Sequence, residues 1–186
     1  DYTTSLVLNA FNVENILARG AAYVAIGEFE LAVSDIEDAL RQDATATEAY
    51  KLLGRVSVKT GNYAESLQYF DRSLELSPLD DDTFFERSFA YVVLGQPDKS
   101  LEDLQKAINL APTNPVYLRE RGLRSFDSGD YQAALTDFTG AINLQLGFDH
   151  VDPKYSEPFL NRAMVHLLLG DFDAAKKDSL NAIRLI

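Results

Sequence analysis

The sequence lacks cysteine and long apolar stretches. None of its 186 residues is cysteine, which excludes disulfides, thiol catalysis and zinc–thiolate sites from this chain and leaves its compartment unassigned. No run of about eighteen apolar residues occurs, so no segment is expected to insert into a membrane. The first residues carry no basic stretch, so no signal peptide is visible.

Positive charge is also scarce. The chain has 17 lysine and arginine residues against 29 aspartate and glutamate residues, which gives a formal net charge of -12. This balance argues against nucleic acid or an anionic membrane surface as the main partner. The hydrophobic fraction of 46% is sufficient for a folded core.

The sequence offers few groups for catalysis or metal binding. It contains no phosphate-binding glycine loop and no nucleophile elbow. His166 is expected to pack in a helix core, whereas His150 lies between Asp149 and Asp152. A metal at His150 is the alternative, but one imidazole and two flexible carboxylates form a poor site. We therefore expect a protein that is not an enzyme and that needs no cofactor or metal.

Glycines give the chain a period. Four are evenly spaced and a fifth follows after a longer interval: Gly27, Gly61, Gly95, Gly129 and Gly170. Each ends one helical pattern, and a polar residue opens the next pattern directly afterwards. Because glycine adopts positive φ at a helix end without a steric penalty, this spacing predicts antiparallel helical hairpins with very short turns.

Small side chains recur at fixed distances from these glycines. Five positions after them lie Ala32, Ser66, Ser100, Ala134 and Ala175. Seven positions before them lie Gly20, Gly54, Ser88, Gly122 and Ala163. Large apolar residues alternate with both sets, which is the pattern that closely packed helices require.

The period and the small-residue, aromatic and proline pattern resemble the tetratricopeptide repeat (TPR) family over nearly the whole chain. The resemblance implies an all-α fold, a right-handed superhelical solenoid of antiparallel helix-turn-helix repeats. The repeats are predicted at 13–46, 47–80, 81–114, 115–155 and 156–186. The fourth contains seven extra residues near 147–153, either a partner-contacting loop or tolerated loop variation.

Both ends of the chain carry helix patterns without a cap. Residues 1–12 match the end of the second helix of a preceding repeat, and 156–186 stop inside such a helix. Solenoids normally end in a polar capping helix, so we expect a fragment of a longer protein with a truncated last repeat. A complete chain with a short leading helix is the alternative. Self-association through the uncapped ends is a further expectation.

Arginine and aspartate recur at a fixed separation in four repeats. The predicted structural ion pairs are Arg19–Asp35, Arg87–Asp103, Arg121–Asp137 and Arg162–Asp178. In the second repeat both positions change together, to Leu53 and Tyr69, which indicates contact inside each hairpin. Arginine suits such bidentate pairs, whose role would be to set packing register.

The resemblance also implies a concave groove lined by the first helix of each repeat. Its inward positions carry over to Leu17, Ala21, Lys51, Arg55, Lys59, Phe85, Phe89, Arg119, Leu123, Phe126, Leu160 and Met164. This surface is apolar outside the second repeat, and apolar grooves mark interaction sites.

A basic stripe interrupts the apolar groove. Lys51, Arg55 and Lys59 recur at every fourth position and share one helix face, which would favour an acidic partner segment. A solvated charged face without a ligand is the alternative. The asparagine that clamps chaperone tails in some relatives is absent, which disfavours that partner.

These patterns predict a protein-interaction scaffold or adaptor. Its partner would be a protein or peptide, as an amphipathic helix or extended segment with acidic residues lying in the groove. A regulatory or substrate-recruiting segment of a larger enzyme is the alternative.

Overall fold

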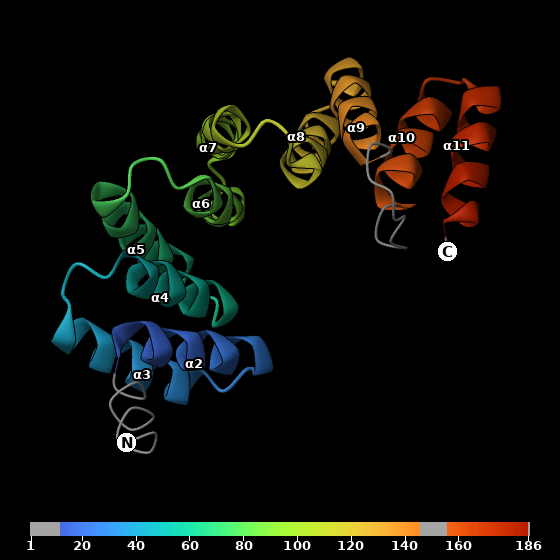
Figure 1. Ribbon diagram of the computed structural model, residues 1–186. Helices are drawn as coiled ribbons and strands as arrows, with labels where there is room; N and C mark the ends of the chain where they lie inside the picture. The colour runs from blue at the N-terminus through green and yellow to red at the C-terminus, as the bar shows by residue number, and fades with distance from the viewer. Residues whose placement is uncertain (1–11, 146–155, 186) are drawn as a thin grey trace. The chain divides into compact units, whose positions relative to one another are not determined.

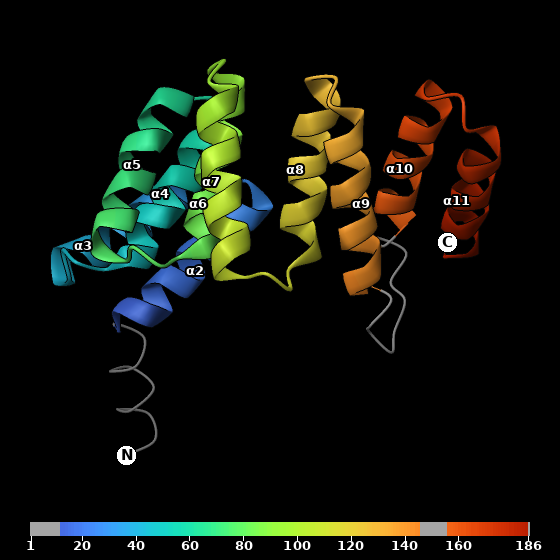
Figure 2. The ribbon, with the colours of Figure 1, turned by 90° about the horizontal axis from the view of Figure 1, so that it is seen from above.

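A computed structural model describes residues 12–145 and 156–185 (Figures 1 and 2). Within these residues the regular structure consists of ten α-helices. They are α2 (Val13–Ile26), α3 (Phe29–Gln42), α4 (Thr47–Lys59), α5 (Tyr63–Leu76), α6 (Asp81–Val93), α7 (Pro97–Leu110), α8 (Pro115–Asp127), α9 (Tyr131–Gln145), α10 (Glu157–Leu168) and α11 (Phe172–Arg184). The all-α prediction is confirmed. The predictions for 1–11, for the insertion near 147–153 and for His150 lie outside the described residues.

The periodic glycines lie at turns between helices. All five have positive φ, from 70° at Gly95 to 84° at Gly129, a region that side chains with a Cβ rarely adopt. At the first turn, the Gly27 amide donates to the Val24 carbonyl, and the Glu28 amide donates to the Tyr23 carbonyl at 3.0 Å. These bonds satisfy carbonyls that the end of α2 would leave unpaired.

Small residues allow the paired helices to approach closely. A Cβ added at Gly54 would lie 2.5 Å from the Phe70 ring, and one added at Gly122 would lie 2.7 Å from the Phe138 ring. Both rings are fully buried. Small residues therefore face large ones, as the sequence predicted, because the missing side chain of each of these glycines leaves space for a phenylalanine ring.

The chain divides into two compact units, 1–100 and 101–186, and the boundary falls within α7. In the first unit α2 pairs with α3 and α4 with α5, while α4 also contacts α2, α3 and α6. In the second unit α8 pairs with α9 and α10 with α11, and α10 also contacts α8 and α9. Figures 1 and 2 both show α10 and α11 side by side. Each hairpin therefore buries its apolar face against the next hairpin of its unit.

Candidate functional site

The structure brings three predicted arginine–aspartate pairs together. Arg19 donates from Nε and Nη2 to Asp35 at 2.7 and 2.8 Å. Arg121 makes the same two bonds to Asp137 at 2.8 and 2.6 Å, and Arg162 does so to Asp178 at 2.7 Å each. Each pair links the two helices of one hairpin. Arg87 and Asp103 fall in different units, and their pairing stays a prediction.

Arg87, Arg121 and Arg162 also reach the preceding repeat, which the sequence reasoning missed. Their second contacts are Arg87 to Asp71 at 2.6 Å, Arg121 to Gln105 at 2.5 Å and Arg162 to Thr139 at 2.9 Å. The three acceptors are evenly spaced, one each in the second, third and fourth repeats. This spacing could have predicted the contacts between repeats from the sequence. The arginine thus joins neighbouring repeats as well as the two helices of one repeat.

The predicted groove residues of the first unit differ in exposure. Leu17 is only 6% exposed and belongs to a core cluster with Leu52 and Val56, so its placement on an open surface is wrong. The physical reason is that α4 packs against α2 and covers the short apolar side chain of Leu17. A long charged side chain at the same position would extend past this contact into solvent. Phe85 is half-buried, and Phe89 is 47% exposed.

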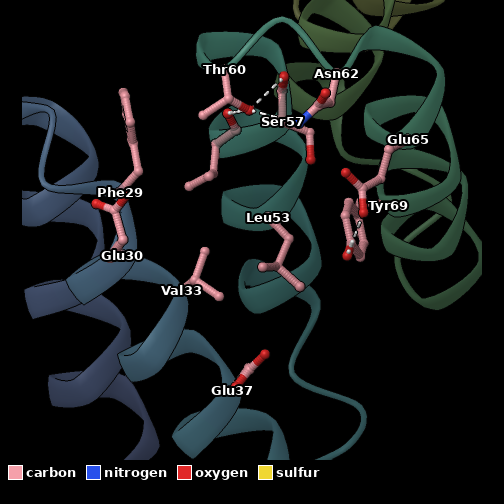
Figure 3. Close-up of a pocket in the computed structure, with 11 residues that line it drawn as sticks. Phe29, Glu30, Val33, Glu37, Leu53, Ser57, Thr60, Asn62, Glu65 and Tyr69 are labelled. Carbon is pink, nitrogen blue, oxygen red and sulfur yellow. Dashed lines mark hydrogen bonds between the residues drawn. The ribbon is translucent and has the colours of Figure 1, made fainter.

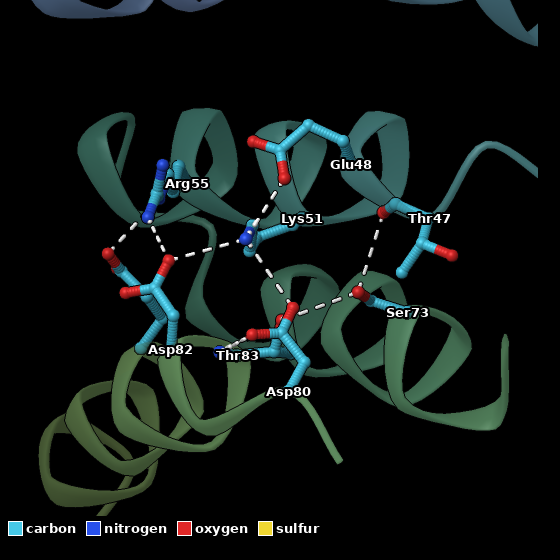
Figure 4. Close-up of polar contacts among 9 residues, drawn as sticks. Thr47, Glu48, Lys51, Arg55, Ser73, Asp80, Asp82 and Thr83 are labelled. Carbon is cyan, nitrogen blue, oxygen red and sulfur yellow. Dashed lines mark hydrogen bonds and ion pairs between the residues drawn. The ribbon is translucent and has the colours of Figure 1, made fainter. Parts of the chain in front are cut away.

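The basic stripe of α4 is largely paired inside the first unit (Figure 4). Lys51 Nζ lies 2.9 Å from Glu48, 3.4 Å from Asp80 and 3.3 Å from Asp82. Arg55 lies 2.7 Å from Asp82. The carboxylates come mainly from the start of α6, where the sequence runs Asp80-Asp81-Asp82.

Arg55 has a further partner in Glu86, at 3.1 Å. Lys51 and Arg55 therefore face four carboxylates, those of Glu48, Asp80, Asp82 and Glu86. An acidic peptide approaching these two cations would meet an excess of negative charge. Of the predicted stripe only Lys59 is exposed, and it has no ion-pair partner in the part of the chain that the structure describes.

Burial and charge act in opposite directions in this cluster. Burial disfavours the charged form of Lys51, but Glu48, Asp80 and Asp82 outweigh it and raise the lysine pKa. Burial likewise opposes ionisation of Asp80, yet hydrogen bonds from Thr83 and the charge of Lys51 bring its pKa below the ordinary value. Burial raises the pKa of Glu86, because Arg55 only partly offsets it. The charged forms of Lys51 and Asp80 thus stabilise the α4–α6 contact, whereas the charged form of Glu86 is disfavoured there.

A shallow pocket remains between α2 and α4, on the predicted groove side. Its lining residues are Ala21, Val24, Ala25, Ile26, Gly27, Phe29, Leu52, Arg55 and Lys59. Ile26 is 71% exposed at its rim. The pocket combines an apolar wall from α2 with basic side chains from α4.

The predicted groove residues of the second unit lie on α8 and α10. Arg119 pairs with Glu120 at 2.9 Å and also with Glu157. Leu123 and Phe126 are half-buried against a core cluster around Phe138.

Leu160 and Met164 are 47% and 51% exposed. They lie on α10, where the next inward position, Leu167, is 48% exposed. His166 on the same helix is half-buried, and its Nδ1 lies 3.7 Å from Asp171. Among the described residues, no group of acidic or histidine side chains could hold a metal ion. None of the described helices is long and apolar enough to cross a bilayer.

Comparison with known proteins identifies the family. Two family models, both described as Tetratricopeptide repeat, match residues 17–81 and 82–114. This chain belongs to the tetratricopeptide repeat family. The predicted family is therefore confirmed, and the matched residues of the TPR chain run from within α2 to the residue before α8.

Relatives of this TPR chain are distant. Hsp70-Hsp90 organizing protein 1 of Glycine max is 23% identical over 195 residues, covering 99% of the TPR chain and 32% of that protein. The chain thus spans about a third of this relative's length. The crystal structure of BtubC from P. vanneervenii has a TM-score of 0.82 at 18% identity, covering 93% of the TPR chain and 79% of BtubC.

A second solved structure is similar over most of both chains. The crystal structure of YrrB has a TM-score of 0.68 at 22% identity, covering 99% of the TPR chain and 91% of YrrB. At these identities both structures establish the fold alone, and the TPR chain's partner must be inferred from its own residues.

Proposed function

We propose that this chain is a scaffold or adaptor that binds an apolar peptide or amphipathic helix of another protein through the first helices of its repeats. Its role is binding, with no catalytic step. TPR membership supports protein–protein interaction in general. YrrB, with the same fold, is described as a TPR protein with an unusual peptide-binding site.

One observation carries the proposal: the apolar stripe along α10. Leu160, Met164 and Leu167 occupy one helix face, separated by one helical turn each, and each is about half exposed. A contiguous apolar surface that stays in water is unfavourable, and on folded proteins it marks an interaction site. An amphipathic helix with matching spacing would bury this stripe.

The first unit supports an apolar ligand as well, but it does not support the expected preference for an acidic one. The pocket between α2 and α4 is apolar on one side, and Phe89 is exposed on α6. Because Lys51 and Arg55 are paired with carboxylates of the same unit, an acidic ligand is not part of this proposal. A single carboxylate beside Lys59 is compatible with it.

A peptide selection tests the proposal. Peptides displayed on phage would be selected against the intact chain, synthesised, and titrated against wild type and Met164→Asp. We expect the substitution to weaken binding at least about tenfold, because it places an uncompensated charge in the apolar contact.

The matched control is Leu180→Asp on α11. Leu180 is 46% exposed, close to the value for Met164, but lies outside the stripe. The control should bind the peptides as wild type does. Equal binding by wild type and Met164→Asp would contradict the proposal, provided that light scattering shows both to have the same oligomeric state.

A further inference from the structure

A second pocket lies in the first unit, where the second repeat lacks the arginine of the other repeats (Figure 3). It has a volume of about 510 Å³ and opens to solvent. Its lining comes from α3, α4 and α5 and the turn between the last two: Phe29, Glu30, Val33, Glu37, Leu53, Val56, Ser57, Thr60, Asn62, Glu65 and Tyr69. It uses the face of α4 that carries Leu53 and Ser57, not the face that carries Arg55 and Lys59.

The repeat register explains the pocket. Leu53 stands one repeat before Arg87, and Glu37 stands one repeat before Asp71, the residue that Arg87 binds at 2.6 Å. Tyr69 takes the position of the paired aspartate. Leu53, Tyr69 and Glu37 all line the pocket. The pocket therefore lies at the position where, in other repeats, an arginine guanidinium links its own hairpin to the preceding hairpin.

The acceptor for a guanidinium remains although the arginine is gone. Positions equivalent to Glu37 hold Asp71, Gln105 and Thr139, and each accepts a hydrogen bond from the arginine of the following repeat. Glu37 is exposed. Within residues 12–145 and 156–185 it has no cationic partner, and the same holds for Glu30 and Glu65.

The negative charges of Glu65 and Glu37 also act on Tyr69 in the pocket. The Tyr69 hydroxyl donates to Glu65 Oε1 at 3.3 Å, and Figure 3 shows both side chains on the α5 side. Burial raises the pKa of Tyr69, and the charges of Glu65 and Glu37 raise it further. A cation entering here would meet carboxylates from both walls and would be stabilised by them.

The remaining walls suit an arginine side chain. Phe29, Val33 and Leu53 offer apolar surface for its methylene groups, and the rings of Phe29 and Tyr69 can receive a guanidinium face. The chain already contains such an arrangement, since the Arg87 guanidinium lies 5.5 Å from the Phe84 ring and 5.6 Å from the Tyr91 ring.

We propose that this pocket binds an arginine side chain from a basic segment of a partner protein, at the position where other repeats place their own arginine. Charge complementarity selects this occupant, because the described residues that line the pocket include three carboxylates and no lysine or arginine, in a chain of net charge -12. The site goes beyond the apolar peptide surface proposed above. It gives the scaffold a second specificity, for positive charge.

The test uses a capped tripeptide, leucine-arginine-leucine, and its citrulline counterpart, which keeps the shape but loses the charge. Each is titrated into the isotope-labelled chain at low ionic strength, with amide and methyl shifts as the readout. We expect shifts centred on Leu53 and Tyr69. The citrulline peptide should bind about five- to tenfold more weakly, and salt should weaken only the arginine peptide.

Three variants place the binding in the pocket. Leu53→Arg with Tyr69→Asp restores the pattern of the other repeats and should abolish binding, because the chain then fills the pocket itself. Glu37→Gln, at an exposed position that does not threaten folding, should weaken the arginine peptide about three- to fivefold. Glu102→Gln, an exposed carboxylate on α7, is the matched control and should bind as wild type does.

Three results would overturn the proposal. The first is equal affinity for the arginine and citrulline peptides, which would indicate a purely apolar contact. The second is unchanged binding by the Leu53→Arg, Tyr69→Asp variant, and the third is an equal loss for Glu37→Gln and Glu102→Gln. Either of these would place the peptide elsewhere. Because none of these variants touches α10, the outcome is independent of the Met164→Asp experiment.

Discussion

The aspartates of the arginine–aspartate pairs are nearly enclosed, while their arginines keep part of the side chain in water. The Asp137 side chain is 5% exposed and that of Arg121 is 26% exposed. Enclosing a carboxylate costs free energy unless charge-assisted hydrogen bonds replace its water, and Arg121 supplies two such bonds. The pair is therefore more sensitive to losing one partner than its net contribution to stability indicates.

Replacing Asp137 with alanine tests this asymmetry. The substitution leaves the Arg121 guanidinium with Gln105 alone, so we expect the free energy of unfolding to fall by about 1–3 kcal/mol in urea titrations. Asp127→Ala is the control in the same repeat, because Asp127 is 67% exposed and lies 3.9 Å from its arginine. It should cost less than about 0.5 kcal/mol, and equal losses would show that burial is not the cause.

Asp80 gives a pH-dependent contribution to stability. Its folded pKa is below the ordinary value, so its interactions with Thr83 and Lys51 stabilise the fold above about pH 4 and are lost as the pH falls through the lowered pKa. Asp80→Asn keeps a helix-capping side chain and removes the charge. It should lower the free energy of unfolding by about 0.5–1 kcal/mol at pH 7, and this difference should shrink as the pH falls through the lowered pKa of Asp80.

Neighbouring Glu86 should behave in the opposite way. Burial raises its folded pKa, so the stability tied to its protonated form is lost as the pH rises through that pKa. Glu86→Gln should match wild type at low pH and be up to about 1 kcal/mol more stable at pH 7. Asp173→Asn, at an exposed position in the first turn of α11, serves as the control for both. If the two variants shift stability with the same sign at pH 7, this account of the cluster is wrong.

In three hairpins, α2–α3, α4–α5 and α8–α9, a glycine of the first helix faces a large side chain of the second. Gly54 and Gly20 occupy the same position in neighbouring repeats. A Cβ on Gly54 would lie 2.5 Å from the Phe70 ring, whereas a Cβ on Gly20 would lie no closer than 3.4 Å to Ile36. The α4–α5 hairpin therefore requires glycine, and the α2–α3 hairpin only requires a small residue.

These two glycines give a matched pair of substitutions. Gly54→Ala should lower the free energy of unfolding by about 1–3 kcal/mol, because the buried Phe70 ring must move. Gly20→Ala should be neutral, or stabilising by up to about 1 kcal/mol, because alanine favours a helix interior. Urea titration of both variants measures the difference. A loss for Gly20→Ala as large as that for Gly54→Ala would contradict the packing described.

In the whole molecule, described contacts connect neighbouring hairpins within each unit, as α2 with α4 and α8 with α10 do. A chain built in this way unfolds locally before it unfolds globally, because each hairpin depends mainly on its neighbours. Stability is then a property of individual interfaces between hairpins.

Hydrogen exchange on Gly54→Ala measures how far a local defect spreads. We expect protection to fall most in α4 and α5, less in α2 and α6, and least in α11. Wild type and Gly20→Ala are the references, and both should keep protection in α4. A uniform loss over all described helices would show that the chain unfolds as one cooperative body.

Much of this architecture was readable from spacing. The evenly spaced glycines predicted the turns, and the joint change to Leu53 and Tyr69 indicated pairing inside hairpins. The burial of Leu17 was missed, as was the pairing of Lys51 with Asp80. Both depend on how a helix is covered by the following repeat, which one-dimensional spacing does not describe.

The sequence by itself determined the helices, their turns and their pairing, because each rests on residues close in the chain. Only the tertiary structure decided which charges remain available to a partner. Stacking placed the carboxylates of α6 against Lys51 and Arg55, and it left Glu37 facing a pocket without an arginine. Whether a charge is compensated depends on distances between side chains of different repeats, since electrostatic energy follows separation in space.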